Sequence, residues 1–245
     1  MRNIKSRDLT NVVKTKEYGG SVKIFTAFYE NHKYCYRVYK ESFYDNSFLK
    51  RMGSLTEEEF EPEYLKPLYL VDKTHGNLSE YAENTQNLGF ICDRNKLLRY
   101  LRISKVLLLN LHREHKYIHG DISSSNILIN DDEVKTYICD FDTITRIGQE
   151  PLDYSWYSDN LLQYLYYYRF DEKVDIYKFN LMTMAVLLNK YEHEVLSLIE
   201  QNDLGEFESD KNVKKLSKEL LLLDPRKPYS GEFIIDYLDD FEYRY

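Results

Sequence analysis

The residues best suited to chemistry in this 245-residue chain form two short strings with oxygen-bearing side chains. The first, H-G-D-I-S-S-S-N, runs from His119 to Asn126, and the second is the D-F-D triplet that begins at Asp140. An aspartate such as Asp121, five residues before an asparagine, suits a carboxylate that orients a hydroxyl and an amide oxygen that holds Mg²⁺. Asp140 adds a carboxylate, and Mg²⁺ prefers oxygen ligands together with water and phosphate. The two strings predict a phosphotransferase site.

The segment between the strings predicts a β-hairpin. Residues Ile127–Ile129 and Val134–Cys139 are apolar and β-rich, and the polar residues 130–133 between them favour a turn. A hairpin here is expected to bring Asn126 and Asp140 together.

The rest of the chain indicates strands first and helices later. Between Leu9 and Lys40, alternating patterns and tight turns predict an antiparallel meander, and two more strands follow. The expected strands are 9–16, 21–29, 33–40, 64–71 and 77–81, the expected helices are 41–52, 95–116, 174–189 and 213–223, and residues 232–238 close the fold. Within 95–116, the apolar residues at helical spacing predict a long buried helix: Leu97, Leu98, Leu101, Val106, Leu109 and Leu111.

Composition excludes several classes of protein. The formal net charge of −8 and the lack of a Lys/Arg-rich block argue against a nucleic-acid partner. No segment reaches the ~18 consecutive apolar residues that span a bilayer, which predicts no membrane partner. Cys35, Cys92 and Cys139 lack the spacing of a metal site or a disulfide framework. We therefore expect a cytoplasmic protein with reduced cysteines.

From about Thr10 to Phe241, the motifs and their order resemble the protein kinase superfamily. The segment 119–126 resembles the catalytic loop, and 140–142 stands where D-F-G occurs in that family. Residues 175–180 (D-I-Y-K-F-N) are similar to the D-x-W-S-x-G helix start, whose aspartate braces the catalytic loop, and 223–228 resemble the late D-P-x-x-R-P element. The resemblance implies an α+β, bilobal protein kinase-like fold, with a small antiparallel β N-lobe (1–82) and a mainly helical C-lobe (83–245).

The resemblance also implies the ligands and their residues. ATP and Mg²⁺ would be the cofactors, with Asp121, Asn126 and Asp140 catalytic and the last two holding the metal. The nucleotide contacts would come from Gly20, Val22, Cys35, Arg37, Glu80, Ala82 and Leu128. Gly20 and Val22 match the end of the glycine-rich loop, whereas Thr15 and Glu17 replace its first two glycines.

The cation of the third strand differs from the family pattern. Arg37 takes the place of the phosphate-binding lysine and, two residues after Cys35, points to the same face. Lys40 could replace it only if a β-bulge reversed the register. The helix glutamate that pairs with this cation in the family is not assigned among Glu41, Glu57, Glu58 and Glu59.

Three further departures bear on mechanism. Gly120 replaces the arginine that receives a phosphorylated activation loop in many kinases, so such phosphorylation is not expected to switch activity. Ser123 replaces the loop lysine that balances the charge of the γ-phosphate. Asp142 replaces the glycine of D-F-G, and we favour a surface acid there over an additional metal ligand.

Three functions follow from the resemblance. The first is a divergent serine/threonine protein kinase that transfers the γ-phosphoryl group of Mg·ATP to a protein hydroxyl, which the segment 175–180 favours. The second is a small-molecule phosphotransferase similar to aminoglycoside or choline kinases, which share the H-G-D-x-x-x-x-N loop. The third is a nucleotide-binding pseudokinase scaffold, favoured by Arg37 and the incomplete glycine loop and opposed by the intact set of Asp121, Asn126 and Asp140.

Overall fold

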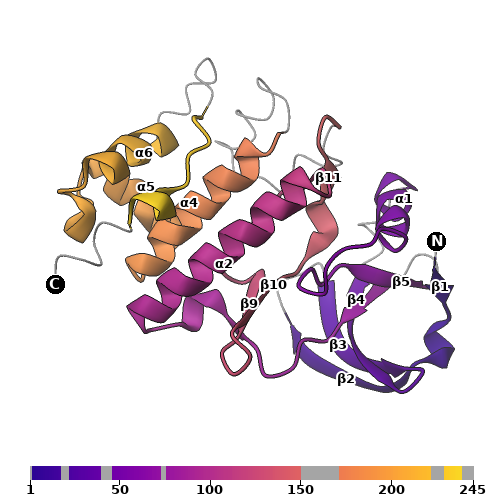
Figure 1. The fold of residues 1–245 in the computed structure, drawn as a ribbon. Helices are drawn as coiled ribbons and strands as arrows, with labels where there is room; N and C mark the ends of the chain where they lie inside the picture. The colour runs from indigo at the N-terminus through magenta and orange to yellow at the C-terminus, as the bar shows by residue number, and fades with distance from the viewer. Residues whose placement is uncertain are drawn as a thin grey trace. The chain divides into compact units, whose positions relative to one another are not determined.

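The computed structural model describes residues 2–17, 22–39, 46–72, 76–149, 171–221 and 229–238. They form a mixed α+β structure in which antiparallel pairing predominates among the strands (Figure 1). The chain divides into two compact units, residues 1–85 with 137–142 and residues 86–136 with 143–245. Gly20, Lys40 and Glu41 lie outside the described residues, as do the whole late motif at 223–228 and residues 150–170.

A six-stranded sheet forms most of the first unit. In spatial order its strands are β1 (Asn3–Ile4), β5 (Pro67–Val71), β6 (Gly76–Glu80), β4 (His32–Tyr39), β3 (Val22–Tyr29) and β2 (Thr10–Glu17). The predicted meander β2–β3–β4 is confirmed. Glu30 and Asn31, with φ of 48° and 66°, form the two-residue turn between β3 and β4, because positive φ at both positions matches the twist of paired strands. The parallel pairing of β1 with β5 was not predicted.

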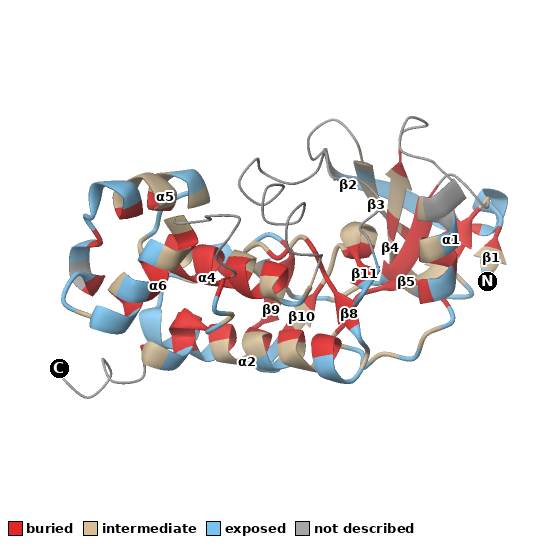
Figure 2. Cartoon of the chain, turned by 90° about the horizontal axis from the view of Figure 1, so that it is seen from above, coloured by how far each residue is buried: buried red, intermediate tan, exposed pale blue. Residues whose placement is uncertain are grey.

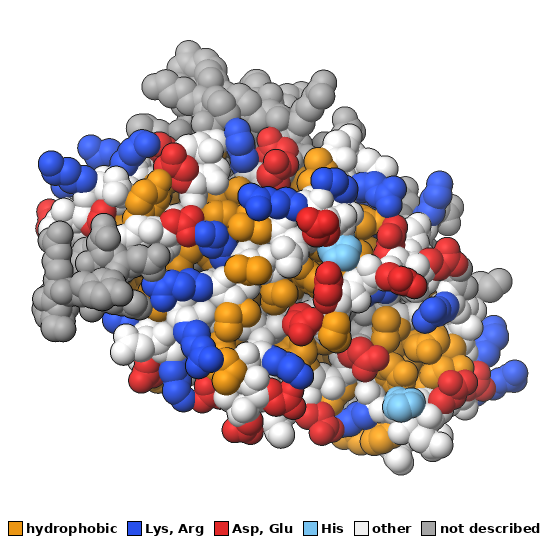
Figure 3. Space-filling model, in the orientation of Figure 1, with side chains coloured by type: hydrophobic (Ala, Val, Ile, Leu, Met, Phe, Trp, Pro, Cys, Tyr) orange, Lys and Arg blue, Asp and Glu red, His pale blue; other side chains and the backbone are white. Residues whose placement is uncertain are grey.

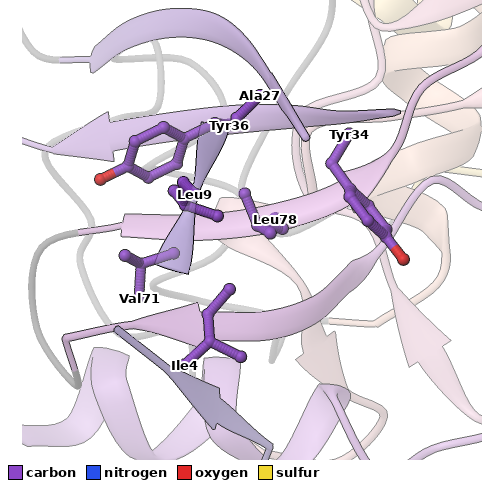
Figure 4. Close-up of a cluster of buried hydrophobic side chains, with 7 residues drawn as sticks. All are labelled: Ile4, Leu9, Ala27, Tyr34, Tyr36, Val71 and Leu78. Carbon is purple, nitrogen blue, oxygen red and sulfur yellow. The ribbon is translucent and has the colours of Figure 1, made fainter. Parts of the chain in front are cut away.

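The two faces of this sheet have different roles. Apolar residues pack on one face, and Figure 4 shows this cluster of Ile4, Leu9, Ala27, Tyr34, Tyr36, Val71 and Leu78. Since side chains alternate along a strand, Cys35 and Arg37 point to the opposite face. The β3–β4 register runs without a shift from Val22↔Tyr39 to Tyr29↔His32. No bulge of the kind that Lys40 would require occurs between residues 32 and 39.

One helix of the first unit, α1 (Asn46–Leu55), packs against β5. The buried Lys66 donates from Nζ to the carbonyl oxygen of Leu55, 2.7 Å away, at the last residue of this helix. Burial lowers the pKa of Lys66 to about 8. The sequence of α1 contains no aspartate or glutamate, and residues 57–59 follow its end. The expected helix glutamate is therefore absent from α1.

The second unit is mainly helical. Its elements are β7 (Gln86–Asn87), α2 (Arg94–Arg113), β8 (Tyr117–Ile118), β9 (Ile127–Asn130), β10 (Lys135–Ile138, which continues into the first unit), β11 (Thr145–Arg146), α4 (Lys173–Leu187), α5 (Glu192–Gln201), α6 (Lys211–Leu221) and the 3₁₀ helix η7 (Ile234–Tyr237). The strands β9 and β10 are neighbours in one sheet, as the predicted hairpin requires. The helix α5 was not predicted.

The long helix α2 is confirmed, but its buried face differs from the predicted one. Leu101, Leu108 and Leu111 are fully buried, whereas Val106 is 55% exposed. At 3.6 residues per turn, a position five residues after Leu101 lies about 140° around the helix. Val106 therefore faces away from the buried stripe of α2. Leu108, which the prediction did not name, belongs to that stripe.

The helix α4 is buried on nearly all sides, as its almost continuous red in Figure 2 shows. It packs against both α2 and α5, which explains why apolar residues cover most of its surface. Asn180 on α4 donates to the carbonyl oxygen of Glu232 (2.6 Å) and accepts from the backbone N–H of Ile234 (2.8 Å). These bonds attach the segment before η7 to α4.

The surface carries both signs of charge. On the face seen in Figure 3, Lys/Arg and Asp/Glu side chains are interspersed with apolar ones. Within the described ranges, no helix combines the length and the apolar character needed to cross a membrane.

Candidate active site

The polar face of the first unit carries a connected group that we call the Arg37 cluster: Arg37, Tyr39, Asn77, Asp140 and Asp142. Arg37 donates from Nη1 to Asp140 Oδ1 at 2.7 Å and from Nη2 to Asp142 Oδ2 at 2.8 Å. Tyr39 donates its hydroxyl to Asp142 Oδ1 at 2.6 Å, and Asn77 Nδ2 donates to Tyr39 at 2.5 Å. One guanidinium is thus held by both carboxylates of the D-F-D triplet.

The residue between these aspartates positions them. Phe141 is buried and packs edge-on against Tyr64, with the ring centroids 6.4 Å apart. The ring centroid of Phe60 also lies 6.4 Å from that of Phe141. Asp140 has a left-handed backbone with φ of 68°, and the 3₁₀ helix η4 (Phe141–Thr143) follows it. The buried ring holds the triplet while the chain turns on either side, so both carboxylates reach the face of the sheet that carries Arg37.

The electrostatics of the Arg37 cluster favour ionised groups. Burial disfavours the charged guanidinium, but Asp140 and Asp142 outweigh this effect and raise the pKa of Arg37 well above its ordinary value. Burial, and then the charge of Asp142, raise the pKa of Tyr39 well above its usual range, so its hydroxyl stays protonated and can donate. With one cation and two carboxylates, the cluster has a formal charge of −1. Such a site favours a metal-bound phosphate over a free one.

The structure corrects the expectation that Asp142 is a surface acid. Its side chain is 17% exposed, and both its oxygens accept hydrogen bonds within the Arg37 cluster. Since α1 offers no carboxylate, Asp142 supplies an acidic partner of Arg37 that the family resemblance placed on a helix. The Nε atom of Arg37 is buried and has no hydrogen-bond partner among the described residues.

Two other predicted nucleotide contacts, Val22 and Cys35, lie on the same face of the sheet as Arg37. Val22 is paired with Tyr39, and Cys35 is two residues from Arg37, so their side chains share that face. Burial raises the pKa of the Cys35 thiol, and the charge of Arg37 opposes this shift. Glu80 is the last residue of β6, and Ala82 follows it in the first unit.

In the second unit, the catalytic-loop string is anchored by the fully buried Asp175. Its Oδ2 accepts from the backbone N–H of His119 (2.7 Å), and its Oδ1 accepts from the N–H of Gly120 (2.8 Å). Nε2 of His112, on α2, lies 2.8 Å from Asp175 Oδ2. The brace that the resemblance implied is therefore present. Gly120 has a φ of 84°, a conformation that favours glycine at this position.

The buried carboxylate of Asp175 is ionised despite its surroundings. Burial alone would raise its pKa, but the bond to His112, the nearby charges and the Gly120 N–H outweigh burial and hold the pKa below its ordinary value. A carboxylate that accepts several hydrogen bonds is stabilised in its charged form. The anchor of the loop is thus electrostatic as well as geometric.

Asp121 and Asn126 face each other within the anchored loop. Asn126 Nδ2 donates to the backbone oxygen of Asp121 at 2.8 Å and to its Oδ2 at 3.1 Å. This orientation leaves the amide oxygen, which accepts a long 3.5 Å bond from Ser125 Oγ, as the atom able to bind a cation. The other carboxylate oxygen of Asp121, Oδ1, lies 3.9 Å from Nζ of Lys178 on α4.

The predicted site residues divide between the units. Val22, Cys35, Arg37, Glu80, Ala82 and Asp140 belong to the first unit, whereas Asp121, Asn126 and Leu128 belong to the second. Leu128 is half-buried between two buried neighbours of β9. That Asn126 and Asp140 share one metal ion, and that Leu128 lies beneath an adenine, stay predictions.

Each unit, taken by itself, offers an oxygen donor of the kind that Mg²⁺ prefers. Asp140 offers a carboxylate and Asn126 an amide oxygen, and Mg²⁺ bound through one or two such protein ligands takes the rest of its shell from phosphate and water. Among the described residues, no group of three or more His, Cys, Asp or Glu side chains forms an all-protein metal cage.

Sequence reasoning missed the roles of Tyr39, Asn77, His112 and Lys178. For two of these residues, the spacing in the sequence contains a signal that could have identified the role. Tyr39 stands two residues after Arg37 and so shares its face, and Lys178 stands three residues after Asp175 on one side of a helix. Asn77 and His112 had none, because their partners are distant in sequence.

Part of the chain is similar to a viral protein. The chain is 31% identical over 134 residues, 51% of its length, to a protein of Acanthamoeba polyphaga mimivirus named "Putative serine/threonine-protein kinase L268". The match spans 23% of that protein. No protein-family model matches the chain. This similarity, together with the anchored H-G-D loop, supports a kinase-like relationship.

Proposed function

We propose that this protein is an ATP-dependent phosphotransferase, a divergent serine/threonine protein kinase that transfers the γ-phosphoryl group of Mg·ATP to a protein hydroxyl. The similarity to a mimivirus protein named as a kinase of this class supports the assignment. The observation that carries it is the loop in which Asp121 is hydrogen-bonded to Asn126 and anchored by Asp175. A general base must be held in place before its substrate arrives, and this loop provides that.

In the proposed reaction, Asp121 orients the acceptor hydroxyl and takes up its proton. Asn126 and Asp140 hold Mg²⁺, which when bound neutralises charge on the phosphates. Arg37 adds a fixed positive charge near the nucleotide. Asp140 and Asp142 hold the two terminal nitrogens of Arg37. Arg37 therefore acts on the nucleotide through the electrostatic field of its charge and through its Nε atom, and its side chain has less freedom to move than a lysine ammonium.

The test is transfer of labelled γ-phosphate from Mg·ATP in a cell lysate, with protein and small-molecule fractions counted separately. We expect label in protein with the wild type and loss of at least 10²-fold with Asp121→Asn, as for removal of a general base. The matched control is Asp132→Asn, a change in an exposed turn, which should keep the wild-type rate. Circular dichroism would show that both variants are folded. Full activity of Asp121→Asn contradicts the proposal.

Two other outcomes identify other functions. Label confined to small molecules would assign the protein to small-molecule phosphotransferases, whose H-G-D loop it shares. A nucleotide-binding scaffold is favoured by one observation, the engagement of both terminal nitrogens of Arg37 by carboxylates. It would be indicated by Mg·ATP binding without labelling of either fraction above the Asp121→Asn level.

A further inference from the structure

The catalytic-loop string lacks a cation of its own. Residues 119–126 contain no lysine or arginine, and Ser123 Oγ is hydrogen-bonded to Ser125 Oγ at 2.8 Å. Phosphoryl transfer spreads negative charge over three equatorial oxygens, and a fixed cation at those oxygens lowers the barrier. A charge supplied from elsewhere in the fold would meet this requirement.

Lys178 of α4 is placed to supply it. Its Nζ lies 3.9 Å from Asp121 Oδ1, and both residues belong to the second unit. The side chain of Lys178 is 16% exposed, so solvent screens its charge less than that of a surface lysine. Its position follows from the helix: three residues before it, Asp175 anchors the backbone of the same loop. One helix thus holds the loop and directs a cation to it.

The oxygen that faces Lys178 is the one left for substrate. Asn126 Nδ2 donates to Asp121 Oδ2, whereas Oδ1 lies on the side of Lys178. A hydroxyl bonded to Oδ1 at about 2.8 Å would hold its oxygen within reach of a flexible ammonium near the same atom. The phosphoryl oxygens that approach this hydroxyl would meet the same ammonium.

A second carboxyl, that of Glu192, is close enough to feel the charges of both Lys178 and Asp121. Burial raises the pKa of Glu192, the first residue of α5, while the charge of Lys178 opposes this rise and that of Asp121 adds to it. Lys178 therefore neutralises part of an acidic site that would otherwise repel phosphate.

We propose that Lys178 is a catalytic residue that binds an oxygen of the transferred γ-phosphoryl group and replaces the cation that the loop lacks at Ser123. This inference rests on the proposed function. The acceptor oxygen forms a bond to the γ phosphorus, and the bond from that phosphorus to the bridging oxygen breaks, its electron pair leaving with ADP. The hydroxyl proton passes to Asp121, and Lys178 keeps its protons throughout.

The test combines binding with transfer, so that the two proposals can fail separately. Affinities for Mg·ATP and Mg·ADP would be measured by calorimetry for the wild type, Lys178→Met and Lys178→Arg. The control is Lys190→Met, a change at an exposed residue just after α4. Because only ATP has a γ-phosphate, we expect Lys178→Met to weaken Mg·ATP binding about tenfold with Mg·ADP unchanged, and Lys178→Arg to recover part of the loss. Equal effects on both nucleotides, or none, overturn the role of Lys178.

Single-turnover transfer supplies the second readout. Lys178→Met should slow transfer roughly 10²-fold, the effect of losing one charge-stabilising group. Adding Ser123→Lys to Lys178→Met should restore at least tenfold of this loss, since the cation returns to the same oxygens from the loop. A purely structural role for Lys178 predicts no such rescue, and its absence from a folded double variant overturns the inference. If the wild type binds Mg·ATP in a Lys178-dependent way but transfers no phosphate, the proposed function fails and the γ-phosphate contact stands.

Discussion

The guanidinium of Arg37 binds two carboxylates that stand two residues apart, and this arrangement sets the character of the first unit's polar face. Each partner has a different position in the network. Asp140 is 31% exposed and can offer an oxygen to a ligand, whereas Asp142 is enclosed by Arg37 and Tyr39. Both aspartates hold the cation, and Asp140 is the more accessible of the two to a ligand.

Removing the enclosed carboxylate should destabilise the fold. Asp142→Ala leaves Tyr39 without this acceptor and Arg37 with one partner, and we expect the free energy of unfolding to fall by about 3 kcal/mol, as when one member of a buried pair is lost. Tyr39→Phe removes hydrogen bonds but no charge, so its cost should be about 1 kcal/mol. Urea unfolding measures both. A smaller loss for Asp142→Ala than for Tyr39→Phe would contradict the role given to Asp142.

Asp175 should give stability a specific dependence on pH. Its carboxyl has a pKa near 3.9 in the unfolded chain and a lower one in the folded protein. Its contribution is therefore fully present above about pH 5 and is lost as pH falls through the folded pKa. The difference in unfolding free energy between wild type and Asp175→Asn should be largest near pH 7 and shrink below pH 4, as measured by urea unfolding across this range. A difference that is constant with pH would show that the carboxylate contributes only through packing.

At the scale of elements, β6 approaches β4 closely because Gly76 has no side chain. A Cβ atom there would lie 2.1 Å from the carbonyl oxygen of Arg37 and 2.9 Å from the ring of Tyr36. The first neighbour is backbone and cannot rotate away. Gly76 thus allows the pairing that sets Arg37 opposite Asn77.

A methyl group at this position should force the two strands apart. We expect Gly76→Ala to cost about 3 kcal/mol of stability, at the upper end of overpacking effects, and to lower affinity for Mg·ATP by moving Arg37. Gly205→Ala is the control, because it meets no atom within 4 Å and carries only the strain of a φ of 57°, about 1 kcal/mol. Thermal unfolding compares the two, and equal losses would mean that the close approach is not the cause.

Strong local periodicity explains which elements could be predicted from the sequence. The meander, α2, α4 and the hairpin have long or regular patterns, whereas β1 has two residues and α5 buries only Val195 and Ile199. The strings around Asp121 and Asp140 were visible because their residues are adjacent in the chain. The partners Asn77 and His112 were not, since distant segments deliver them through strand register and helix packing.

At the scale of the whole molecule, the proposed ligand groups belong to both units: Arg37 and Asp140 to the first, Asn126 and Lys178 to the second. Ligand binding should therefore stabilise the chain as a whole. At 100 times its Kd, Mg·ATP should add about 2.7 kcal/mol, and EDTA should remove most of this gain. Asp140→Asn should show the same loss without EDTA. A thermal shift by ATP that is unaffected by EDTA would argue against a metal held at Asp140.

The D-F-D triplet concentrates two tasks in three consecutive residues. The proposed metal ligand and the counter-ion of Arg37 flank a single buried ring, while α1 carries no charge partner for this arginine. The helix α1 instead contacts the Arg37 cluster through a ring, since Phe48 packs edge-on against Tyr39 with centroids 5.3 Å apart. A rotation of the triplet about the buried ring of Phe141 would move the proposed metal ligand and both carboxylate partners of Arg37 in the same motion.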